Sequence, residues 1–395
     1  MNREDFEILN QNIIYLDNSA TTLKPSILPQ KTSEYYNNYS ANAHRGDYDI
    51  SQKVDTMYEN TRTKIKKYIN AKSNKEIIFT NGSTDSLNKI IFGYFKKNLK
   101  ENDEVLITKS EHASNILPWF ELKDQIGIKI KYIKLTKDHK VTLENIKKQI
   151  NKNTKVISVA HITNVIGDIR PIKEIIKLSK EKNIEVLIDA AQSIGHTKID
   201  VTDLDVDFLI FSAHKMLGPT GLGIIYGKEK LLNNINPVIF GGGMNLSFES
   251  NGSRIYKDLP YLLEAGTPNI AAVIGFGSII DYINNIGLNN IKNYEEKLTY
   301  YTKNKLKEIE NIIIYNELSE SSIIIFNYKN ISAKDLANYL NKYNICVRAG
   351  NHCAKLLKDE IKVKNTCRIS LYFYNTKEEI DILINALKNI TLNKI

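Results

Sequence analysis

The chain of 395 residues is poor in the features that define several protein classes. Its three cysteines, Cys346, Cys353 and Cys367, show neither a CxxC nor a Cys/His spacing, which argues against a disulfide framework and against a bound metal. No apolar run approaches the roughly 18–20 residues of a membrane span. The amino-terminal stretch MNREDFEILNQN lacks the apolar core of a secretory signal. We therefore expect a cytoplasmic protein without a membrane partner.

The charge is unbalanced but not concentrated. Lys and Arg number 54 against 45 Asp and Glu, a formal net charge of +9, yet the basic residues are scattered along the chain. No basic arm and no nucleic-acid motif with interleaved aromatic residues appears. A solvated lysine-rich surface explains this charge, and we expect no nucleic-acid partner. An apolar fraction of 42% allows a sizeable core.

Strand-like and helix-like segments alternate through the first two thirds of the chain, which predicts a mostly parallel α/β sheet with helices on both faces. The sequence pattern changes near Pro268 and predicts two long helices followed by a smaller α+β domain. No flexible linker, repeat or low-complexity segment is apparent in the sequence. The expected strands cover residues 76–80, 104–108, 128–135, 155–161, 185–189, 207–211 and 222–226. The expected helices cover residues 51–69, 86–95, 271–287 and 290–309.

Two of these strands end in polar side chains that suit one chemistry. The first run, EVLIDAAQ, ends in Asp189 and Gln192, and the second, DFLIFSAHK, ends in Ser212, His214 and Lys215. Ligands of open α/β sheets bind just beyond the carboxyl ends of the strands. A lysine and an aspartate there are what pyridoxal phosphate (PLP) needs, because the amine binds its aldehyde and the carboxylate keeps the pyridine nitrogen protonated. Taken singly, each residue also fits a solvated loop.

Three further strand ends carry polar groups. Ser83 and Thr84 open a helix after Gly82 and can bind phosphate, or can serve as an ordinary helix cap. His112 can stack on a flat cofactor or play a structural part, and Asn164 follows another strand. Five strand ends on one sheet edge favour a real site over five independent coincidences.

The carboxyl-terminal part adds a thiol. Cys353 lies in a polar loop, and Arg348, His352 and Arg368 are candidates for the positive neighbour that a reactive thiolate needs. Arg368 has no acidic neighbour in sequence and is expected to hold a carboxylate by a two-point contact. Cys346 and Cys367 fall in apolar strand patterns and are expected to be buried.

Taken together, these residues resemble a known family. The ordered motifs are YLDNSATT, ANAHRG, NGSTDS, EHASN, HITNVIG, DAAQ, SAHKMLGPTGLG, EAGTPN, RAGNHCA and CRISLYFYNT, and they span nearly the whole chain. They resemble class V aminotransferase-like, fold-type I PLP enzymes, and among these the SufS-type (group II) cysteine desulfurases. The short spacing from Arg348 to Cys353 fits group II. The resemblance implies a large α/β PLP-binding domain over residues 1–267 and a small domain over residues 268–395. The amino-terminal segment is expected to contribute to the small domain.

The resemblance also implies roles around the cofactor. Lys215 would carry PLP and shuttle a proton, Asp189 would pair with the pyridine nitrogen, and Gln192 would bond the ring hydroxyl. His112 would stack on the ring. Thr267 would reach the phosphate of a neighbouring subunit, which implies a homodimer. The residues expected at the phosphate are Ser83, Thr84, Ser212 and His214.

On the substrate side, the resemblance implies conversion of L-cysteine to L-alanine. Asn164 and Arg368 would bind the substrate carboxylate with Arg348 nearby, and His44 and Arg45 would line the entrance. Cys353 would accept the sulfur as a persulfide and pass it to a SufE- or SufU-like acceptor protein for iron–sulfur cluster assembly.

Some positions depart from the family pattern. Asn351 stands where a histidine is usual, so a proton relay through that position is in doubt, and EHASN and SAHK replace the more usual EHHAN and SGHK. Three alternatives stay open. They are a selenocysteine lyase, which shares the motifs; another class V enzyme such as an aminotransferase or kynureninase; and a non-enzymatic basic binding protein.

Overall fold

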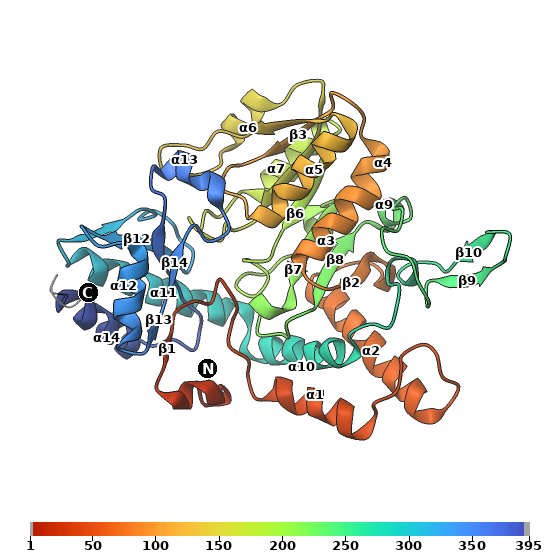
Figure 1. Cartoon of the computed structure of the whole chain (residues 1–395), viewed down its shortest axis with the longest axis horizontal. Helices are drawn as coiled ribbons and strands as arrows, with labels where there is room; N and C mark the ends of the chain where they lie inside the picture. The colour runs from red at the N-terminus through yellow and green to blue at the C-terminus, as the bar shows by residue number, and fades with distance from the viewer. Residues whose placement is uncertain (1–2, 391–395) are drawn as a thin grey trace.

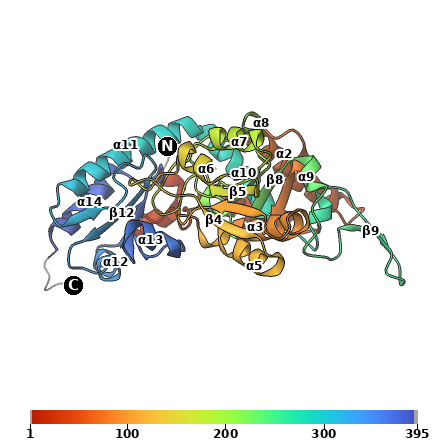
Figure 2. The ribbon, with the colours of Figure 1, turned by 90° about the horizontal axis from the view of Figure 1, so that it is seen from above.

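A computed structural model describes residues 3–390 (Figures 1 and 2). Residues 1–2 and 391–395, which form the outer ends of the two expected domain ranges, lie outside the described part. The described chain forms one large sheet, one smaller sheet and two short two-stranded pairings.

The large sheet has seven strands in the order β2-β8-β7-β6-β5-β3-β4. All neighbours are parallel except that β8 runs antiparallel to both β2 and β7. Because β8 is antiparallel to both of its neighbours, β2 and β7 run in the same direction. The carboxyl ends of the parallel strands β2, β3, β5, β6 and β7 therefore lie at one edge of the sheet. The strands are β2 (Ile77–Thr80), β3 (Glu104–Ile107), β4 (Lys129–Tyr132), β5 (Thr154–Ala160), β6 (Glu185–Asp189), β7 (Phe208–Ser212) and β8 (Gly223–Gly227).

Both faces of this sheet are covered by helices, which explains the continuous apolar runs. In β7, Leu209 and Phe211 join the core that includes α2, α7 and α10, whereas Phe208 and Ile210 join the core that includes α3 and α5. Figure 2 shows the strands between these two helix layers. The helices around the sheet are α1 (Ile27–Asn38), α2 (Asp49–Tyr68), α3 (Ser83–Ile90), α4 (Lys96–Asn98), α5 (Leu117–Ile126), α6 (Leu143–Gln149), α7 (Ile172–Glu181), α8 (Val201–Leu204), α9 (Glu229–Leu232) and α10 (Ile270–Ile286).

The smaller sheet is antiparallel, in the order β11-β12-β15-β14. Its core also takes Ile14 and Leu16 from the amino-terminal segment, because β1 pairs with β13 in parallel. The elements are β1 (Ile14–Tyr15), β11 (Ile312–Ile314), β12 (Ile323–Tyr328), β13 (Ile345–Cys346), β14 (Arg348–Gly350), β15 (Thr366–Ser370), α11 (Leu288–Lys307), α12 (Ala333–Asn341), α13 (Lys358–Ile361) and α14 (Lys377–Lys388).

A hairpin of β9 (Asn245–Phe248) and β10 (Arg254–Tyr256) projects away from the body of the molecule (Figure 1). Its apolar side chains are exposed: Phe248 is 72% accessible, and Leu246 and Ile255 are also exposed. The sequence patterns give no indication of this hairpin.

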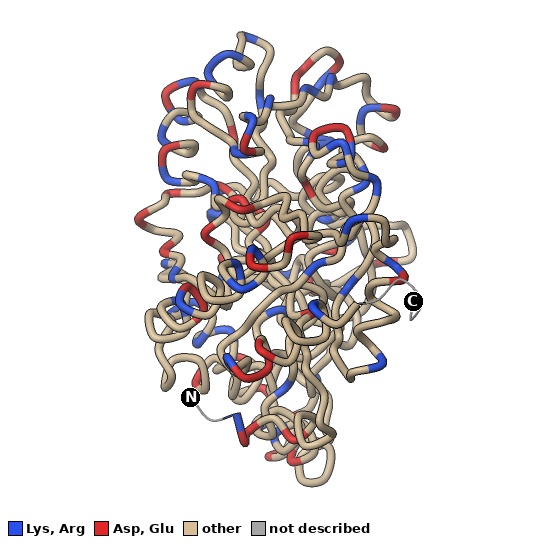
Figure 3. The backbone as a smooth tube through the Cα atoms, turned by 90° about the vertical axis from the view of Figure 1, so that its left-hand side faces the viewer, with Lys and Arg blue, Asp and Glu red and all other residues tan. Residues whose placement is uncertain are grey.

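Charged residues of both signs are interspersed along the backbone in the view of Figure 3. Within residues 3–390, no single helix is long and apolar enough to cross a membrane; α10 and α11 meet length and composition only as a pair bent by 71°. The predicted α/β class, with a mostly parallel sheet flanked by helices, is confirmed.

Candidate active site

Lys215 ends a short 3₁₀ turn, Ala213–Lys215, that follows β7 directly. The side chain is half-buried, and burial lowers the pKa of its amine to about 8. Arg368 and Arg348 lower this pKa further, while the charges of Asp189 and Cys353 raise it. About a tenth of the amine is therefore unprotonated at pH 7, far more than at the ordinary pKa of lysine, and the unprotonated form is the one that a nucleophilic lysine requires.

Asp189 ends the neighbouring strand β6 and is buried. Its Oδ1 accepts a hydrogen bond of 2.9 Å from the Ala191 amide, and burial raises the pKa of the carboxyl to about 6. Gln192, also buried, donates from Nε2 to the Ser19 carbonyl at 2.8 Å. A buried carboxyl with a single backbone donor suits a cationic nitrogen such as a protonated pyridine.

The start of α3 and the end of β7 form a cradle of donors. The Ser83 amide and hydroxyl both lie 2.7 Å from the Ser212 hydroxyl oxygen. Gly82 has φ +146°, and a Cβ at Gly223 would come within 2.5 Å of the Gly82 backbone, so two glycines permit the close approach. The first N–H groups of a helix lack internal partners, so this cradle fits a phosphate.

His112 is fixed by its own loop. The Ser114 amide donates to Nδ1 at 3.2 Å, which places the ring proton on Nε2. The Ser114 hydroxyl lies 3.1 Å from the same nitrogen and 2.7 Å from the Thr84 hydroxyl. Burial, with Lys215 and two arginines, lowers the pKa of His112 to about 4. The ring is thus neutral and flat beside Lys215, as stacking on an aromatic cofactor requires.

Arg368, in β15, is buried and held from two sides. Nη1 donates to the Asn164 carbonyl and Nη2 to Asp17 Oδ1, each at 2.8 Å. Arg368 has no acidic neighbour in sequence, but Asp17 reaches it across 351 positions of sequence. The missed clue is that Asp17 ends the apolar run IIYL, just as Asp189 ends its strand.

Two buried polar atoms at this place have no hydrogen-bond partner among the described residues, Arg368 Nε and Asn164 Oδ1. The other end of the Asn164 amide donates from Nδ2 to the His352 carbonyl at 2.7 Å. Buried polar groups are almost always paired, so these two atoms indicate a polar ligand.

Cys353 is exposed and sits in a tightly held loop with φ +59°. Its carbonyl accepts from the Ala113 amide at 2.7 Å, and its amide donates to Asn351 Oδ1 at 3.1 Å. Asn351 thus caps the loop through its side-chain oxygen. Cys367 is buried as expected, whereas Cys346 is only half-buried.

His352 does not supply positive charge to the thiol, contrary to expectation. It is buried against Thr366, whose carbonyl and hydroxyl lie 3.0 Å from Nε2, and burial lowers its pKa to about 3. The cationic groups that interact with the thiol are Arg368 and Lys215, since the charge of Cys353 acts on both of them.

Comparisons with known proteins agree with this geometry. The family model described as aminotransferase class-V matches residues 14–383. The chain is 40% identical over 384 residues to a probable cysteine desulfurase of Halalkalibacterium halodurans, covering 97% of this chain and 94% of the relative. It is 41% identical over 392 residues to one of Staphylococcus epidermidis, covering 98% and 95%.

Solved structures agree as well. The apo cysteine desulfurase of Thermococcus onnurineus superposes with a TM-score of 0.94 at 35% identity, covering 98% of this chain and 96% of that one. The cysteine desulfurase CsdA of Escherichia coli gives 0.92 at 31% identity, with the same coverage. The chain belongs to the cysteine desulfurase family of class V aminotransferases. The recognition of a class V cysteine desulfurase from the motifs is confirmed.

In this cysteine desulfurase family member, three expected residues lie apart from the cluster. The described contacts of His44 are with Asp55 and Glu59 of α2 and with the rings of Tyr58 and Tyr261, and none is with the substrate-side residues. Thr267 and Arg45 are exposed. Within one chain, the structure does not bring His44, Arg45 or Thr267 to Lys215.

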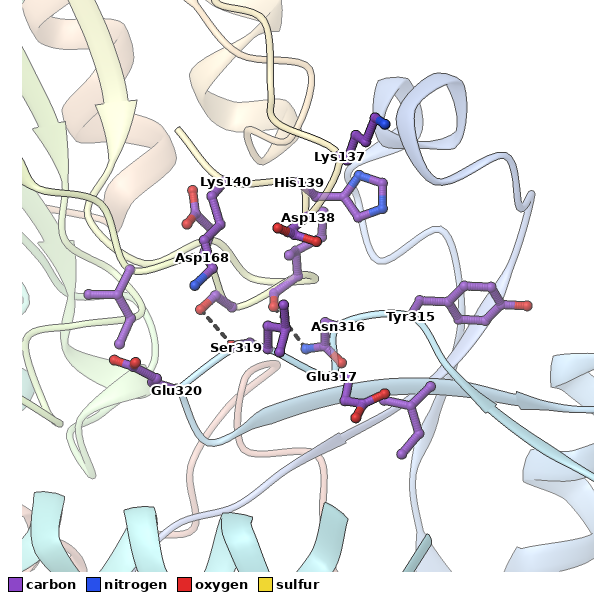
Figure 4. Close-up of a pocket in the computed structure, with 15 residues that line it drawn as sticks. Lys137, Asp138, His139, Lys140, Asp168, Tyr315, Asn316, Glu317, Ser319 and Glu320 are labelled. Carbon is purple, nitrogen blue, oxygen red and sulfur yellow. Dashed lines mark hydrogen bonds between the residues drawn. The ribbon is translucent and has the colours of Figure 1, made fainter. Parts of the chain in front are cut away.

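A separate pocket of about 370 Å³ lies between the two parts of this family member (Figure 4). It contains none of the expected site residues. On its floor the Ser319 hydroxyl donates to the Gly167 carbonyl at 2.9 Å, and Asn316 Nδ2 donates to the Ile166 carbonyl at 2.8 Å. These bonds fix the loop after Asn164 against the connection between β11 and β12 of the smaller sheet. Among the described residues, no group of three or more His, Cys, Asp or Glu is placed to hold a metal.

Proposed function

We propose that this protein removes sulfur from L-cysteine with the help of PLP, forming L-alanine and a persulfide on Cys353. The observation that carries the proposal is that the charges of Cys353 and Arg368 both act on the Lys215 amine, while the charge of Cys353 also acts on the Arg368 guanidinium. An exposed thiol thus lies within reach of a strand-end amine and of a buried guanidinium with an unpaired Nε. A carboxylate, an amine and a sulfur on one small substrate match these three groups.

The residues of the site fit the cofactor. Lys215 would hold the aldehyde end, Asp189 the pyridine nitrogen, and Ser83 with Ser212 the phosphate, while Gln192, His112, Thr84 and His214 would complete the pocket. When bound, PLP supplies an electron sink that acidifies the Cα proton of an amino acid. Lys215, with a pKa of about 8, can accept that proton and return it.

Sulfur transfer belongs to Cys353. Its thiolate forms a bond to the substrate sulfur while the Cβ–S bond of the substrate breaks. The electron pair of that bond stays on carbon, which is protonated and leaves as alanine. The sulfur is oxidised to the persulfide level and the carbon is reduced, so no outside oxidant is needed. Arg368 and Asn164 would hold the substrate carboxylate near Arg348 during this step.

The proposal extends to the SufS-type group, to the cytoplasm, and to a SufE- or SufU-like acceptor protein that takes the sulfur for iron–sulfur cluster assembly. Exposure of Cys353 supports transfer to a second protein. We also propose a homodimer in which Thr267 and His44 complete the site of the other subunit, since neither lies at the site of its own chain. The division into domains near residue 267 belongs to the same proposal.

The test compares wild-type protein with Cys353→Ala, Lys215→Ala and, as a matched thiol control, Cys346→Ala. We expect visible PLP absorbance in all but Lys215→Ala, and alanine and persulfide formation from cysteine only in wild type and Cys346→Ala. Selenocysteine is assayed in parallel, because selenium leaves more readily than sulfur and Cys353→Ala should still convert it.

Cysteine turnover that survives in Cys353→Ala would contradict the role of Cys353. Wild-type turnover of selenocysteine alone would instead identify a selenocysteine lyase. Protein without PLP absorbance, or with unchanged absorbance in Lys215→Ala, would contradict the whole proposal.

A further inference from the structure

The carbonyl oxygen of His214, the residue before Lys215, collects four donors from one short segment of chain. The Lys24 amine lies 2.8 Å from it, and the Thr21 hydroxyl, the Thr22 hydroxyl and the Thr22 amide each lie 3.1 Å from it. A carbonyl oxygen offers two lone pairs, so four converging donors are more than it can bind ideally. The Lys24 amine is the nearest of the four donors, and its protonated form makes the strongest bond.

Lys24 has no acidic partner that would explain its place. Besides His214, its amine contacts the Thr22 carbonyl at 2.7 Å and the Thr21 hydroxyl at 3.3 Å, and no described carboxylate lies within ion-pair distance. The side chain is half-buried, and burial lowers the pKa of the amine to about 7. An ammonium group in such a position loses hydration that only carbonyl and hydroxyl oxygens replace.

The turn that Lys24 contacts needs an anchor. Leu217, two residues after Lys215, has φ +65°, a left-handed conformation that is unfavourable for a branched side chain. Its amide donates to the Thr22 hydroxyl at 2.8 Å, while that hydroxyl donates to the His214 carbonyl. The segment from Thr21 to Lys24 therefore forms hydrogen bonds with the turn on both sides of Lys215.

We infer that Lys24 is a positioning residue for Lys215: its side-chain amine donates to the His214 carbonyl and fixes the turn that carries the reactive amine. The inference rests on the proposed function in so far as Lys215 is the residue that binds PLP. Lys24 itself would touch neither cofactor nor substrate.

The first experiment follows amide hydrogen exchange in the apo protein and needs no cofactor. The variants are Lys24→Met, which removes the charge, Lys24→Arg, which keeps it, and the control Lys31→Met in α1, whose lysine pairs with Glu34. We expect faster exchange over residues 213–218 in Lys24→Met alone, by about tenfold, since a charge-assisted hydrogen bond is lost. Unchanged exchange in that segment, or faster exchange of every segment together, would overturn the inference.

The second experiment measures the rate at which apo protein attaches added PLP to Lys215, with borohydride trapping and peptide mapping. Lys24→Met should be slower than wild type, Lys24→Arg should recover, and Lys31→Met should match wild type. In the loaded enzyme, kcat should fall while KM for cysteine changes little, because Arg368 and Asn164 are untouched. A KM effect without a kcat effect would contradict the inference.

If Lys24→Met does not fold, Thr22→Val is compared with Thr22→Ser. This pair tests the hydrogen bonds between the same segment and the turn, by amide exchange and by the rate of PLP attachment. A wild-type protein that attaches no PLP at Lys215 would refute the proposed function, while the exchange experiment would still decide the inference about Lys24.

Discussion

The single residues of the site owe their chemistry to neighbours that lie far away in sequence. Strand-end residues such as Asp189 and Lys215 could be found from the sequence, because continuous apolar runs mark buried strands and the polar group after each run is easily seen. Asp17, the partner of Arg368, could not be paired from sequence, because 351 positions separate the two and only the folded chain joins them. The burial that makes His352 neutral was equally hidden, since a histidine in a polar loop looks accessible.

A prediction at this scale concerns the pKa of Lys215. Burial and two arginines lower it to about 8, and the charge of Asp189 raises it. The free amine is the reactive form, so PLP attachment to apo protein should become faster as pH rises through about 8 and then level off. Removing the negative charge in Asp189→Asn should move this midpoint to lower pH.

The measurement is the initial rate of attachment to Lys215 across a pH series. Asp281→Asn, which alters an exposed carboxylate paired with Lys64, is the control and should leave the midpoint in place. A midpoint that rises in Asp189→Asn would refute the assigned sign.

Helices and strands were predicted well where the spacing of apolar residues has one clear period. They were predicted less well where the pairing of strands determines the structure. The expected helices at residues 51–69 and 271–287 correspond to α2 (Asp49–Tyr68) and α10 (Ile270–Ile286). The antiparallel direction of β8 could not be predicted, because a strand buried on both faces has the same apolar run in either direction. The β9–β10 hairpin was missed because its exposed side chains show no core-facing alternation.

The loop that follows Asn164 provides a prediction at the level of elements. Gly167 has φ +68°, and a Cβ there would come within 1.9 Å of the Ser321 hydroxyl oxygen. Gly167→Ala should therefore combine backbone strain with a clash between the loop and the smaller sheet. We expect a loss of about 1–3 kcal/mol in the free energy of unfolding.

Denaturant unfolding checks this value. Gly252→Ala is a matched control, because Gly252 also has positive φ (+87°) but a Cβ added there would meet no atom within 4 Å, so this variant isolates the backbone part. Equal losses in the two variants would show that the contact with Ser321 contributes nothing.

At the scale of the whole molecule, the site residues are gathered by contacts that no local pattern encodes. The amino-terminal segment reaches the smaller sheet through Asp17 and Arg368, the neighbourhood of Asp189 through Ser19 and Gln192, and the Lys215 turn through Lys24. These contacts join the two parts of the chain around one site. His44 and Thr267 remain outside it, and apolar side chains of the β9–β10 hairpin stay exposed.

The last prediction concerns this hairpin and the proposed homodimer. Monomeric proteins rarely expose large apolar surface, so Leu246 and Phe248 on one face of the hairpin, and Ile255 on the other, should be covered by a second copy of the chain. Leu246→Ser combined with Phe248→Ser should shift the protein toward monomer in analytical ultracentrifugation. Tyr300→Ser is the control, because Tyr300 on α11 is 71% exposed, nearly the same as Phe248 at 72%, but lies on a helix of the other part of the chain. A double variant with wild-type association would contradict the role of the hairpin.

If Thr267 completes the site across the dimer, the monomeric variant should also retain PLP less well on dialysis than Tyr300→Ser does.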